Sequence, residues 1–379
     1  MKFSTKQIHA GQKPEKITGA VIEPIFMTST YANEYLGESK GFDYGRTTNP
    51  TRFALERNLA ALENGKYGFC FGSGMAAIQA LITLFKPGDH IICTNNTYGG
   101  TYRLYEQIIT GYGIEFTYVD TSDMEKVKAS AKDNTKLIYI ETPTNPMLTI
   151  TDLAAMAEFA KSKNIITCVD NTFMSPYFQN PLDFGIDIVN HSSTKYINGH
   201  SDVIGGCLIT SNDEYAERFT FFQKTIGAVP SPFDCWLILR ATKTLSQRMR
   251  DHNDNAIAIV EALRDNPKIS RILYPGLESH PQYELAKKQM RGFGGIVSLD
   301  MGTREKAAAV CDNVKIFTLA ESLGGVESLI CHPASMTHAS VPKEVRESFG
   351  LTDGLVRLSV GIEDKEDLID DIKNAMDKV

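Results

Sequence analysis

Short apolar runs alternate with helical patterns between residue 48 and about residue 245. Runs with the length and composition of buried strands occupy residues 67–71, 90–93, 116–119, 137–140, 165–169 and 186–189. Helical patterns, such as the one at residues 75–85, fall between them. Because strands that alternate with helices form a parallel sheet covered on both faces, we predict a largely parallel α/β fold for this region.

The segments on either side have different patterns. Residues 1–47 mix polar residues, glycine and proline without a sustained period, which predicts an extended arm of the kind that reaches a neighbouring subunit. A long helical pattern at residues 245–263 leads into a region with strand-like runs at 295–299 and 355–362 and an amphipathic helix at its end. We therefore expect an arm (1–47), a large domain (48–245) and a smaller C-terminal α/β domain (246–379).

The composition narrows the classes of function. The 379 residues carry a formal charge of -7, which argues against nucleic acid or an anionic membrane as partner and favours a small molecule. The N-terminal residues lack the apolar run of an export signal, and the seven cysteines form no C-x-x-C pair and lie mostly in apolar runs. Reduced core thiols of this kind predict a cytoplasmic protein. Since no histidine spacing is typical of a metal site, we expect no metal.

Lys195 and Asp170 are the strongest candidates for chemistry. Each follows an apolar strand-like run, and in an open parallel sheet ligands bind beside the carboxyl ends of the strands. A lysine amine can hold the aldehyde of pyridoxal phosphate as a Schiff base, while a carboxylate can keep the pyridine nitrogen protonated, so that the ring becomes an electron sink. Taken singly, a lysine is more often a surface charge and an aspartate after a strand is more often a turn or cap residue. It is the pair that suggests the cofactor.

Residues 72–75 (GSGM) follow the first predicted strand and open a helix, whose free N–H groups and positive dipole end suit a phosphate. Ser192 and Thr194 would add hydroxyl donors to the same group. The loop fits equally well a plain strand-to-helix turn that uses its glycines for tight geometry.

Two rival enzyme classes share parts of these motifs. Gly72-x-Gly74-x-x-Ala77 matches the dinucleotide fingerprint of nicotinamide-dependent oxidoreductases, although no acidic residue lies at the expected offset and Lys195 would have no task. Ser192-x-x-Lys195 matches a serine acyl-transfer nucleophile with its lysine, but the chain has neither the Ser-Asp-Asn nor the Lys-Thr-Gly motif of that class.

Three further residues have the chemistry of ligand binding. Asn145 lies in a proline-rich turn (141–146) that could point it toward the cofactor's ring hydroxyl, unless it only forms the turn. Tyr98, just past the second strand, offers a face for stacking on the pyridine, but it is also compatible with a core or surface position. Arg357 lies opposite the apolar face of its strand and could bind a substrate carboxylate or form a structural ion pair.

Together these motifs resemble the transsulfuration family of pyridoxal-phosphate enzymes, which covers cystathionine γ-lyase, cystathionine γ-synthase, cystathionine β-lyase and methionine γ-lyase. The resemblance spans nearly the whole chain and rests on the ordered segments 42–52 (FDYGRTTNPTR), 73–77 (SGMAA), 141–146 (ETPTNP), 169–173 (VDNTF), 193–196 (STKY), 199–202 (GHSD), 320–325 (AESLGG) and 357–361 (RLSVG). It implies the aspartate-aminotransferase-like fold (fold type I), pyridoxal 5'-phosphate as cofactor, an amino acid as substrate, and a homotetramer built from catalytic dimers.

The resemblance also implies roles for individual residues. Lys195 would be the Schiff-base lysine and proton carrier, Asp170 the partner of the pyridine nitrogen, and Tyr98 a stacked ring that also acts as acid or base. The cofactor would be bound further by Gly74, Met75, Thr172, Ser192 and Thr194, and by Tyr44 and Arg46 of a neighbouring subunit. The substrate would be held by Arg357, Ser322 and Asn145 at its carboxylate, with Tyr44 also in the substrate site.

Within the family, the residues favour enzymes that act at the γ-carbon. Glu321 is the residue type found in γ-acting members, and with Arg103 it would bind the distal polar end of cystathionine, which disfavours a β-lyase. Gly100 stands where methionine γ-lyases usually carry cysteine, which disfavours that activity. We expect the cystathionine γ-lyase reaction, which gives L-cysteine, 2-oxobutanoate and ammonia. Cystathionine γ-synthase is the alternative, because the two enzymes share almost all of these residues.

Overall fold

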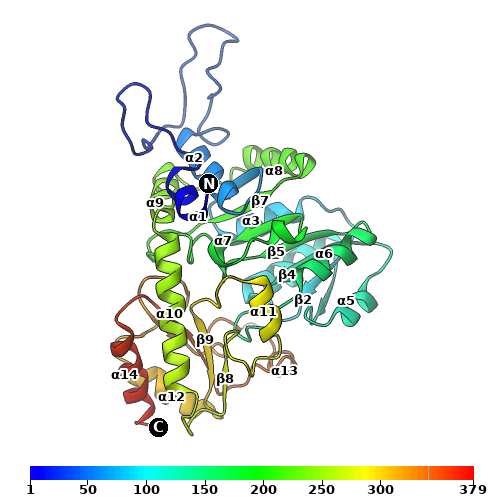
Figure 1. Ribbon diagram of the computed structural model, residues 1–379. Coiled ribbons are helices and arrows are strands. Elements are labelled where there is room, and N and C mark those ends of the chain that lie inside the picture. The colour runs from blue at the N-terminus through cyan, green and yellow to red at the C-terminus, as the bar shows by residue number, and fades with distance from the viewer. Residues whose placement is uncertain (340) are drawn as a thin grey trace.

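The computed structural model describes residues 1–339 and 341–379, and its larger part is built on a seven-stranded sheet (Figure 1). The strands are β1 (Tyr67–Phe71), β2 (His90–Thr94), β3 (Glu115–Val119), β4 (Thr135–Glu141), β5 (Ile166–Asp170), β6 (Ile188–His191) and β7 (Gly206–Thr210). Their order is β1-β7-β6-β5-β4-β2-β3. The strands from β6 to β3 run parallel, whereas β7 runs antiparallel to β1 and β6. The predicted α/β fold with a largely parallel sheet is confirmed.

The sequence pattern indicated every strand of this sheet except β7. This strand follows a long loop rather than a helix, so it stands outside the strand–helix alternation on which the prediction depended. Its antiparallel pairing with β6 needs no helical crossover, which is consistent with that loop connection.

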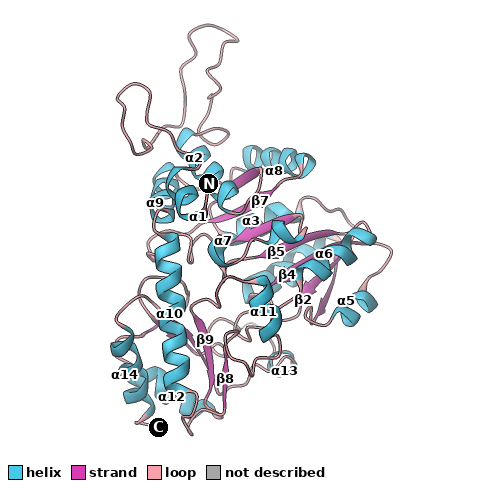
Figure 2. Ribbon diagram, viewed as in Figure 1, coloured by secondary structure: helices cyan, strands magenta, loops and turns pink. Residues whose placement is uncertain are grey.

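Helices cover both faces of the sheet (Figure 2). One face carries α3 (Gly74–Ile82) and α8 (Asp213–Ile226), and the other carries α2 (Pro50–Leu62), α5 (Met124–Ser130), α6 (Leu153–Ser162) and α9 (Pro232–Thr242). In β4, Leu137 and Tyr139 belong to the apolar cluster that includes α3, while Ile138 and Ile140 belong to the cluster that includes α6. Because both faces are buried, the strands are nearly continuous in apolar residues.

Shorter helices connect strands of the large sheet. They are α4 (Gly99–Leu104), η1 (Tyr105–Ile109) and η2 (Thr110–Tyr112) after β2, and α7 (Ser175–Phe178) and η3 (Pro181–Phe184) after β5. The first of them, α4, begins directly after Tyr98 and therefore fixes where that side chain leaves the backbone.

The long helix α10 (Leu245–Leu263) runs from the large sheet to a second, five-stranded sheet (Figure 1). That sheet contains β8 (Arg271–Leu273), β9 (Ile296–Asp300), β10 (Thr318–Leu319), β11 (Leu329–Cys331) and β12 (Leu355–Ser359), in the order β10-β11-β12-β9-β8. Its apolar face packs against α10, α12 (Arg304–Asn313) and α14 (Lys365–Met376). Two further helices of this part are α11 (Tyr283–Gln289) and α13 (Lys343–Ser348).

The N-terminal arm differs in part from the prediction. Its first residues form helix α1 (Phe3–His9), which is held against the body because the buried Gln7 side chain donates a 2.9 Å hydrogen bond to the Lys243 carbonyl. After α1 the chain projects from the body in two loops (Figure 1). These loops carry exposed apolar side chains, among them Ile17, Val21 and Leu36.

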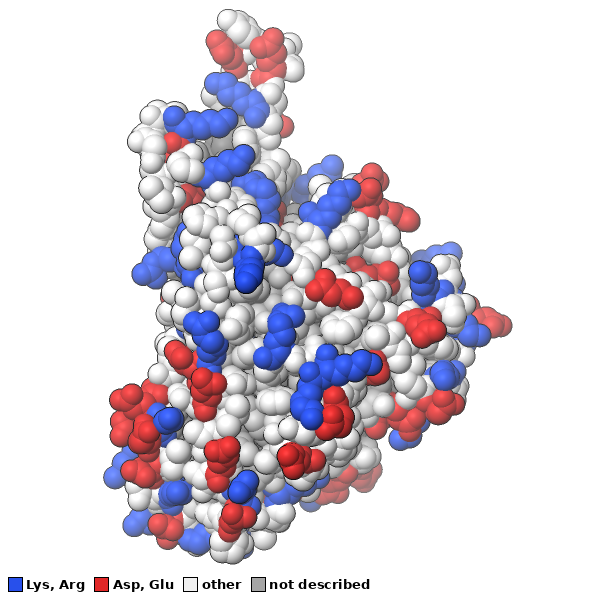
Figure 3. Space-filling view, viewed as in Figure 1, with Lys and Arg blue, Asp and Glu red and all other residues white. Residues whose placement is uncertain are grey.

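The described part of the chain holds no helix that is both long and apolar enough to cross a membrane. The cysteines at 70, 93, 168, 207, 235, 311 and 331 are buried and free. On the face shown in Figure 3, acidic and basic side chains are interspersed, which differs from the continuous basic surface expected of a nucleic-acid-binding face.

Candidate active site

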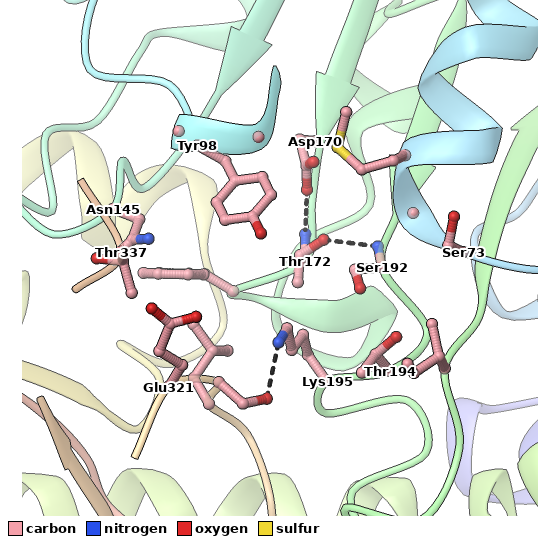
Figure 4. Close-up of a pocket in the computed structure, with 18 of the residues that line it drawn as sticks. Ser73, Tyr98, Asn145, Asp170, Thr172, Ser192, Thr194, Lys195, Glu321 and Thr337 are labelled. Atoms are coloured by element: carbon pink, nitrogen blue, oxygen red, sulfur yellow. Dashed lines mark hydrogen bonds between the residues drawn. The ribbon is translucent and has the colours of Figure 1, made fainter. Parts of the chain in front are cut away.

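A pocket of about 1170 Å³ is lined by residues from the carboxyl edge of the large sheet and by residues of the second sheet (Figure 4). It brings together most of the residues singled out in the sequence: Gly74, Met75, Tyr98, Arg103, Asn145, Asp170, Thr172, Ser192, Thr194, Lys195, Glu321, Ser322 and Arg357. The pocket lies where the strand-end rule, by which ligands bind beside the carboxyl ends of parallel strands, predicts a binding site.

Lys195 is mostly buried in this pocket, and its Nζ donates a 2.7 Å hydrogen bond to the hydroxyl of Ser322. Burial and the nearby Arg357 cation lower the pKa of Lys195 to about 8, against an opposing effect of Glu321. A lowered pKa increases the fraction of neutral amine at neutral and mildly alkaline pH. Since the neutral amine is the nucleophile, Lys195 is suited to react with a carbonyl carbon.

Asp170 ends β5 with a carboxylate that is fixed by hydrogen bonds on both oxygens. Its Oδ1 accepts from the Thr172 backbone N–H at 3.0 Å, and its Oδ2 accepts from the Asn190 side chain at 2.8 Å and the Tyr139 hydroxyl at 3.2 Å. Sequence reasoning missed Asn190 and Tyr139. Asn190 is the cross-strand neighbour of Asp170, so the strand-end rule applied to β6 would have found it.

The N-terminus of α3 forms an anion cradle beside Ser192. The Ser73 hydroxyl caps the helix by accepting from the Ala76 N–H at 3.0 Å, while the N–H groups of Gly74 and Met75 have no acceptor within the helix. A Cβ at position 74 would lie 3.1 Å from the Ser192 Cβ, so the close approach of helix and loop depends on glycine. These donors fit the phosphate of pyridoxal 5'-phosphate.

Thr172 and Thr194 hold the loop that carries Ser192 and Lys195. The Thr172 hydroxyl accepts from the Ser192 N–H at 2.9 Å, a contact drawn in Figure 4. The Thr194 hydroxyl donates to the Gly205 carbonyl at 3.2 Å and accepts from the Gly205 N–H at 3.0 Å. Both threonines therefore shape the cradle through the backbone around it.

Tyr98 borders the cavity with a half-exposed ring (Figure 4). The ring folds back over the start of α4, where a Cβ at position 100 would lie only 2.4 Å from the Tyr98 Cε1. Gly100 therefore has a steric role, in addition to differing from the cysteine that methionine γ-lyases usually carry at this position. It provides the space in which the Tyr98 ring lies.

Arg357 reaches the pocket from the polar face of β12. Val356 and Leu358 belong to the apolar core on the opposite face, as the alternation in the sequence indicates. The guanidinium donates to the Asn145 Oδ1 at 2.9 Å and to the Ser322 carbonyl at 2.6 Å, and it forms no ion pair with a carboxylate among the described residues. It is almost fully buried, so an incoming carboxylate is the natural partner for its charge.

Glu141, to which the sequence analysis gave no role, is buried at the end of β4. One carboxylate oxygen accepts from the Tyr98 N–H at 2.8 Å and the Thr97 hydroxyl at 3.3 Å, and the other accepts from the Asn145 N–H at 3.0 Å. Burial and the neighbouring Asp170 raise the pKa of Glu141 to about 8. Its position at a strand end, next to Asp170, was the signal that could have found it.

Tyr44 and Arg46 do not line the pocket of their own chain. Both lie in the arm, where Tyr44 is half exposed and the Arg46 guanidinium donates to the Lys224 carbonyl at the end of α8. Their expected contribution to a neighbouring subunit stays a prediction.

Comparisons with known proteins find similar sequences over nearly the whole chain. The family model described as "Cys/Met metabolism PLP-dependent enzyme" matches residues 4–377. The chain is 51% identical to a cystathionine gamma-lyase of Bacillus subtilis, with 100% of both chains covered, and 51% identical to a cystathionine gamma-synthase of Mycobacterium leprae, with 99% of this chain and 96% of the relative covered. Relatives of 50% identity are also named cystathionine beta-lyase.

A solved structure extends the likeness to three dimensions. The crystal structure of cystathionine gamma-lyase from Lactobacillus plantarum, complexed with L-serine, superposes with a TM-score of 0.97 at 44% identity and covers 100% of this chain and 99% of that one. The fold predicted from the resemblance is therefore confirmed.

Proposed function

We propose that this chain, which belongs to the Cys/Met metabolism PLP-dependent enzyme family, is a cystathionine γ-lyase. Members of the family named above act on carbon–sulfur bonds, and the chain uses pyridoxal 5'-phosphate. The proposed reaction cleaves the Cγ–S bond of L-cystathionine with one water, giving L-cysteine, 2-oxobutanoate and ammonia.

The observation that carries the proposal is the pair of opposite charges, Arg103 and Glu321, on the wall of a pocket that also holds Arg357. Cystathionine has an amino-acid group at each end. Arg357 would bind the carboxylate of the reacting end, while Arg103 and Glu321 match the carboxylate and ammonium of the distal end. A substrate that ends in a methyl thioether, such as methionine, has no charged group at its distal end for Arg103 and Glu321 to bind.

The cofactor is assigned to the residues around the cradle and Asp170. The α3 N-terminus (Gly74, Met75) and the loop residues Ser192 and Thr194 would bind its phosphate, and Thr172 would support them. Asp170 would hold a proton on the pyridine nitrogen, and Lys195 would bind the aldehyde carbon. When bound, the cofactor supplies an electron sink that makes the substrate's Cα–H acidic.

The chain itself would then supply binding and proton transfer. Arg357, with Asn145 and Ser322, orients the substrate so that its Cα proton faces Lys195, which removes it. Tyr98 would contribute a second acid or base at the edge of the cavity. Proton removal at Cβ and departure of the thiol from Cγ complete the elimination, and water releases the keto acid and ammonia.

We also propose a homotetramer of catalytic dimers in the cytoplasm, with each pocket completed by Tyr44 and Arg46 of a neighbouring subunit. Two observations support this assembly: the arm projects from the body, and it exposes apolar side chains that a second chain would cover.

Cystathionine γ-synthase is the alternative, favoured by the equally similar relatives of that name. The test is a paired assay of the purified enzyme. The lyase releases 2-oxobutanoate from L-cystathionine, whereas a synthase forms cystathionine rapidly from cysteine and O-succinyl- or O-acetylhomoserine and cleaves it poorly. Pyruvate in place of 2-oxobutanoate would show cleavage of the Cβ–S bond instead and would overturn the γ-lyase assignment.

A further inference from the structure

The buried carboxylate of Glu141 connects two segments on different sides of the pocket. Its acceptor oxygens are divided between them: Oε2 binds the N–H of Tyr98 and the hydroxyl of Thr97, and Oε1 binds the N–H of Asn145. Both N–H groups lie in loops, outside any helix or strand. One side chain thereby satisfies donors that would otherwise lack a partner within regular structure.

Each of the two segments carries a group that lines the pocket. Tyr98 places its ring at the edge of the cavity, and Asn145 holds the guanidinium of Arg357 at 2.9 Å. The distance between the proposed acid or base and the proposed carboxylate anchor therefore depends on what joins the two loops. The described structure also shows a second link between them, from the Asn96 side chain to the Thr144 hydroxyl at 3.0 Å.

Burying a carboxylate at this place costs free energy, which a purely structural link between the two loops would not require. Glu141 is buried, and Asp170, its neighbour on β5, adds like-charge repulsion, so that burial and Asp170 together raise the pKa of Glu141. Hydrogen bonds from the two loops favour the charged form and offset part of that cost. To a charged carboxylate they are stronger than the neutral ones that an amide or hydroxyl could form.

We propose that Glu141 is a positioning residue for carbon–sulfur bond cleavage, because its carboxylate sets the Tyr98 ring and the Asn145–Arg357 pair at a fixed distance from each other. This inference rests on the proposed function, in which those groups act on one substrate. Glu141 would act through Tyr98 and Asn145, without contact to the substrate.

The test compares the holoenzymes of wild type, Glu141→Gln and Glu141→Asp. Glutamine has nearly the same shape but only one acceptor oxygen, and its amide NH₂ would face the N–H of one of the two loops. Above pH 8, where the Glu141 carboxylate is charged, we expect amide hydrogen exchange to rise about tenfold or more in residues 96–104 or 143–148, because a charge-assisted hydrogen bond is lost. Aspartate keeps both acceptor oxygens one methylene further back and should restore part of the protection.

The kinetic expectation separates positioning from general stability. Glu141→Gln should lower kcat by about tenfold or more through displacement of Tyr98, and should raise KM where Asn145 no longer holds Arg357. Asp371→Asn is the matched control, because the buried Asp371 carboxylate likewise accepts three hydrogen bonds, from the backbone N–H groups of Lys315, Ile316 and Phe317, none of which lines the pocket. This control should loosen residues 315–317 and leave both pocket segments and the kinetic constants unchanged.

Unchanged exchange in both pocket segments of Glu141→Gln would overturn the proposal, and so would an equal change produced by Asp371→Asn. The exchange readout does not use cystathionine. If the wild type fails to cleave cystathionine while Glu141→Gln still loosens the two segments, the proposed function is wrong and the tie between the loops stands.

Discussion

The Nζ of Lys195 donates a 2.7 Å hydrogen bond to the hydroxyl of Ser322, a residue whose backbone lies at φ 93°. Residues other than glycine avoid positive φ values of this size. They adopt them where the surrounding structure imposes the conformation. The Ser322 carbonyl also accepts from Arg357 at 2.6 Å. One strained residue thus contacts both the proposed nucleophile and the proposed carboxylate anchor.

The first prediction separates the hydroxyl of Ser322 from its strain. Ser322→Ala removes the hydroxyl and keeps a Cβ at the unfavourable φ, whereas Ser322→Gly removes both. We expect the glycine variant to unfold in urea with a free energy about 1 kcal/mol higher than the alanine variant, because glycine tolerates positive φ. Both should lose a similar part of kcat/KM, since both lack the hydroxyl. An alanine variant as stable as the glycine variant would contradict strain at this position.

The second prediction concerns the pH dependence of cofactor binding. The pKa of Lys195 is lowered to about 8 by burial and Arg357, so the neutral, nucleophilic amine forms as pH rises through about 8. When the cofactor is stripped and returned, the rate at which its visible absorption band appears should increase with pH, with a midpoint near 8 and a plateau above it. A midpoint near the ordinary lysine value of 10.5 would show that the site does not perturb this amine.

A variant identifies the cause of that midpoint. Arg357→Leu removes the nearby cation while leaving the site buried, so the Lys195 pKa and the midpoint should move upward. Reduction with borohydride and peptide mapping of the wild type checks the assignment itself, since the label must lie on the peptide that contains Lys195.

The third prediction uses the space beside Tyr98. A Cβ at position 100 would lie 2.4 Å from the Tyr98 Cε1 and 3.0 Å from its Cδ1, so Gly100→Ala must displace the ring. The ring is half exposed and free to move outward, and we therefore expect little loss of folding stability but a fall in kcat of about tenfold or more. Gly111→Ala is the matched control, because nothing lies within 4 Å of the added Cβ there. Equal kcat values for the two variants would show that the position of Tyr98 does not matter.

Much of the site could be predicted from sequence because the fold places strand ends together. Lys195 and Asp170 were found as polar residues that follow apolar runs, and the parallel sheet brings such positions to one edge. The alternation around Arg357 likewise indicated which way its side chain leaves β12. These inferences needed only local periodicity and one general rule of α/β folds.

The rest depends on contacts between distant segments. The binding of Arg357 by Asn145 and Ser322, in place of a structural ion pair with a carboxylate, follows from how the second sheet meets the first. Nothing in the sequence signals the positive φ of Ser322, because serine usually adopts negative φ and neither of its neighbours is a glycine. The sequence around Glu141, a run of threonines and prolines, predicts a turn. It gives no sign that the Glu141 carboxylate accepts hydrogen bonds from two separate loops.

The fourth prediction concerns the arm. If Arg46 serves the pocket of a neighbouring subunit, the Arg46→Ala and Lys195→Ala enzymes are each inactive but complement each other, since a mixed dimer holds one pocket with both native residues. Random exchange of subunits should then restore about a quarter of the wild-type activity, because half of the dimers are mixed and each has one intact pocket. Lys195→Ala mixed with Arg357→Ala is the control, because both residues line the pocket of the same chain and no combination restores it. No activity in the first mixture, after exchange is verified by mass, would place Arg46 in its own chain's site or outside any site.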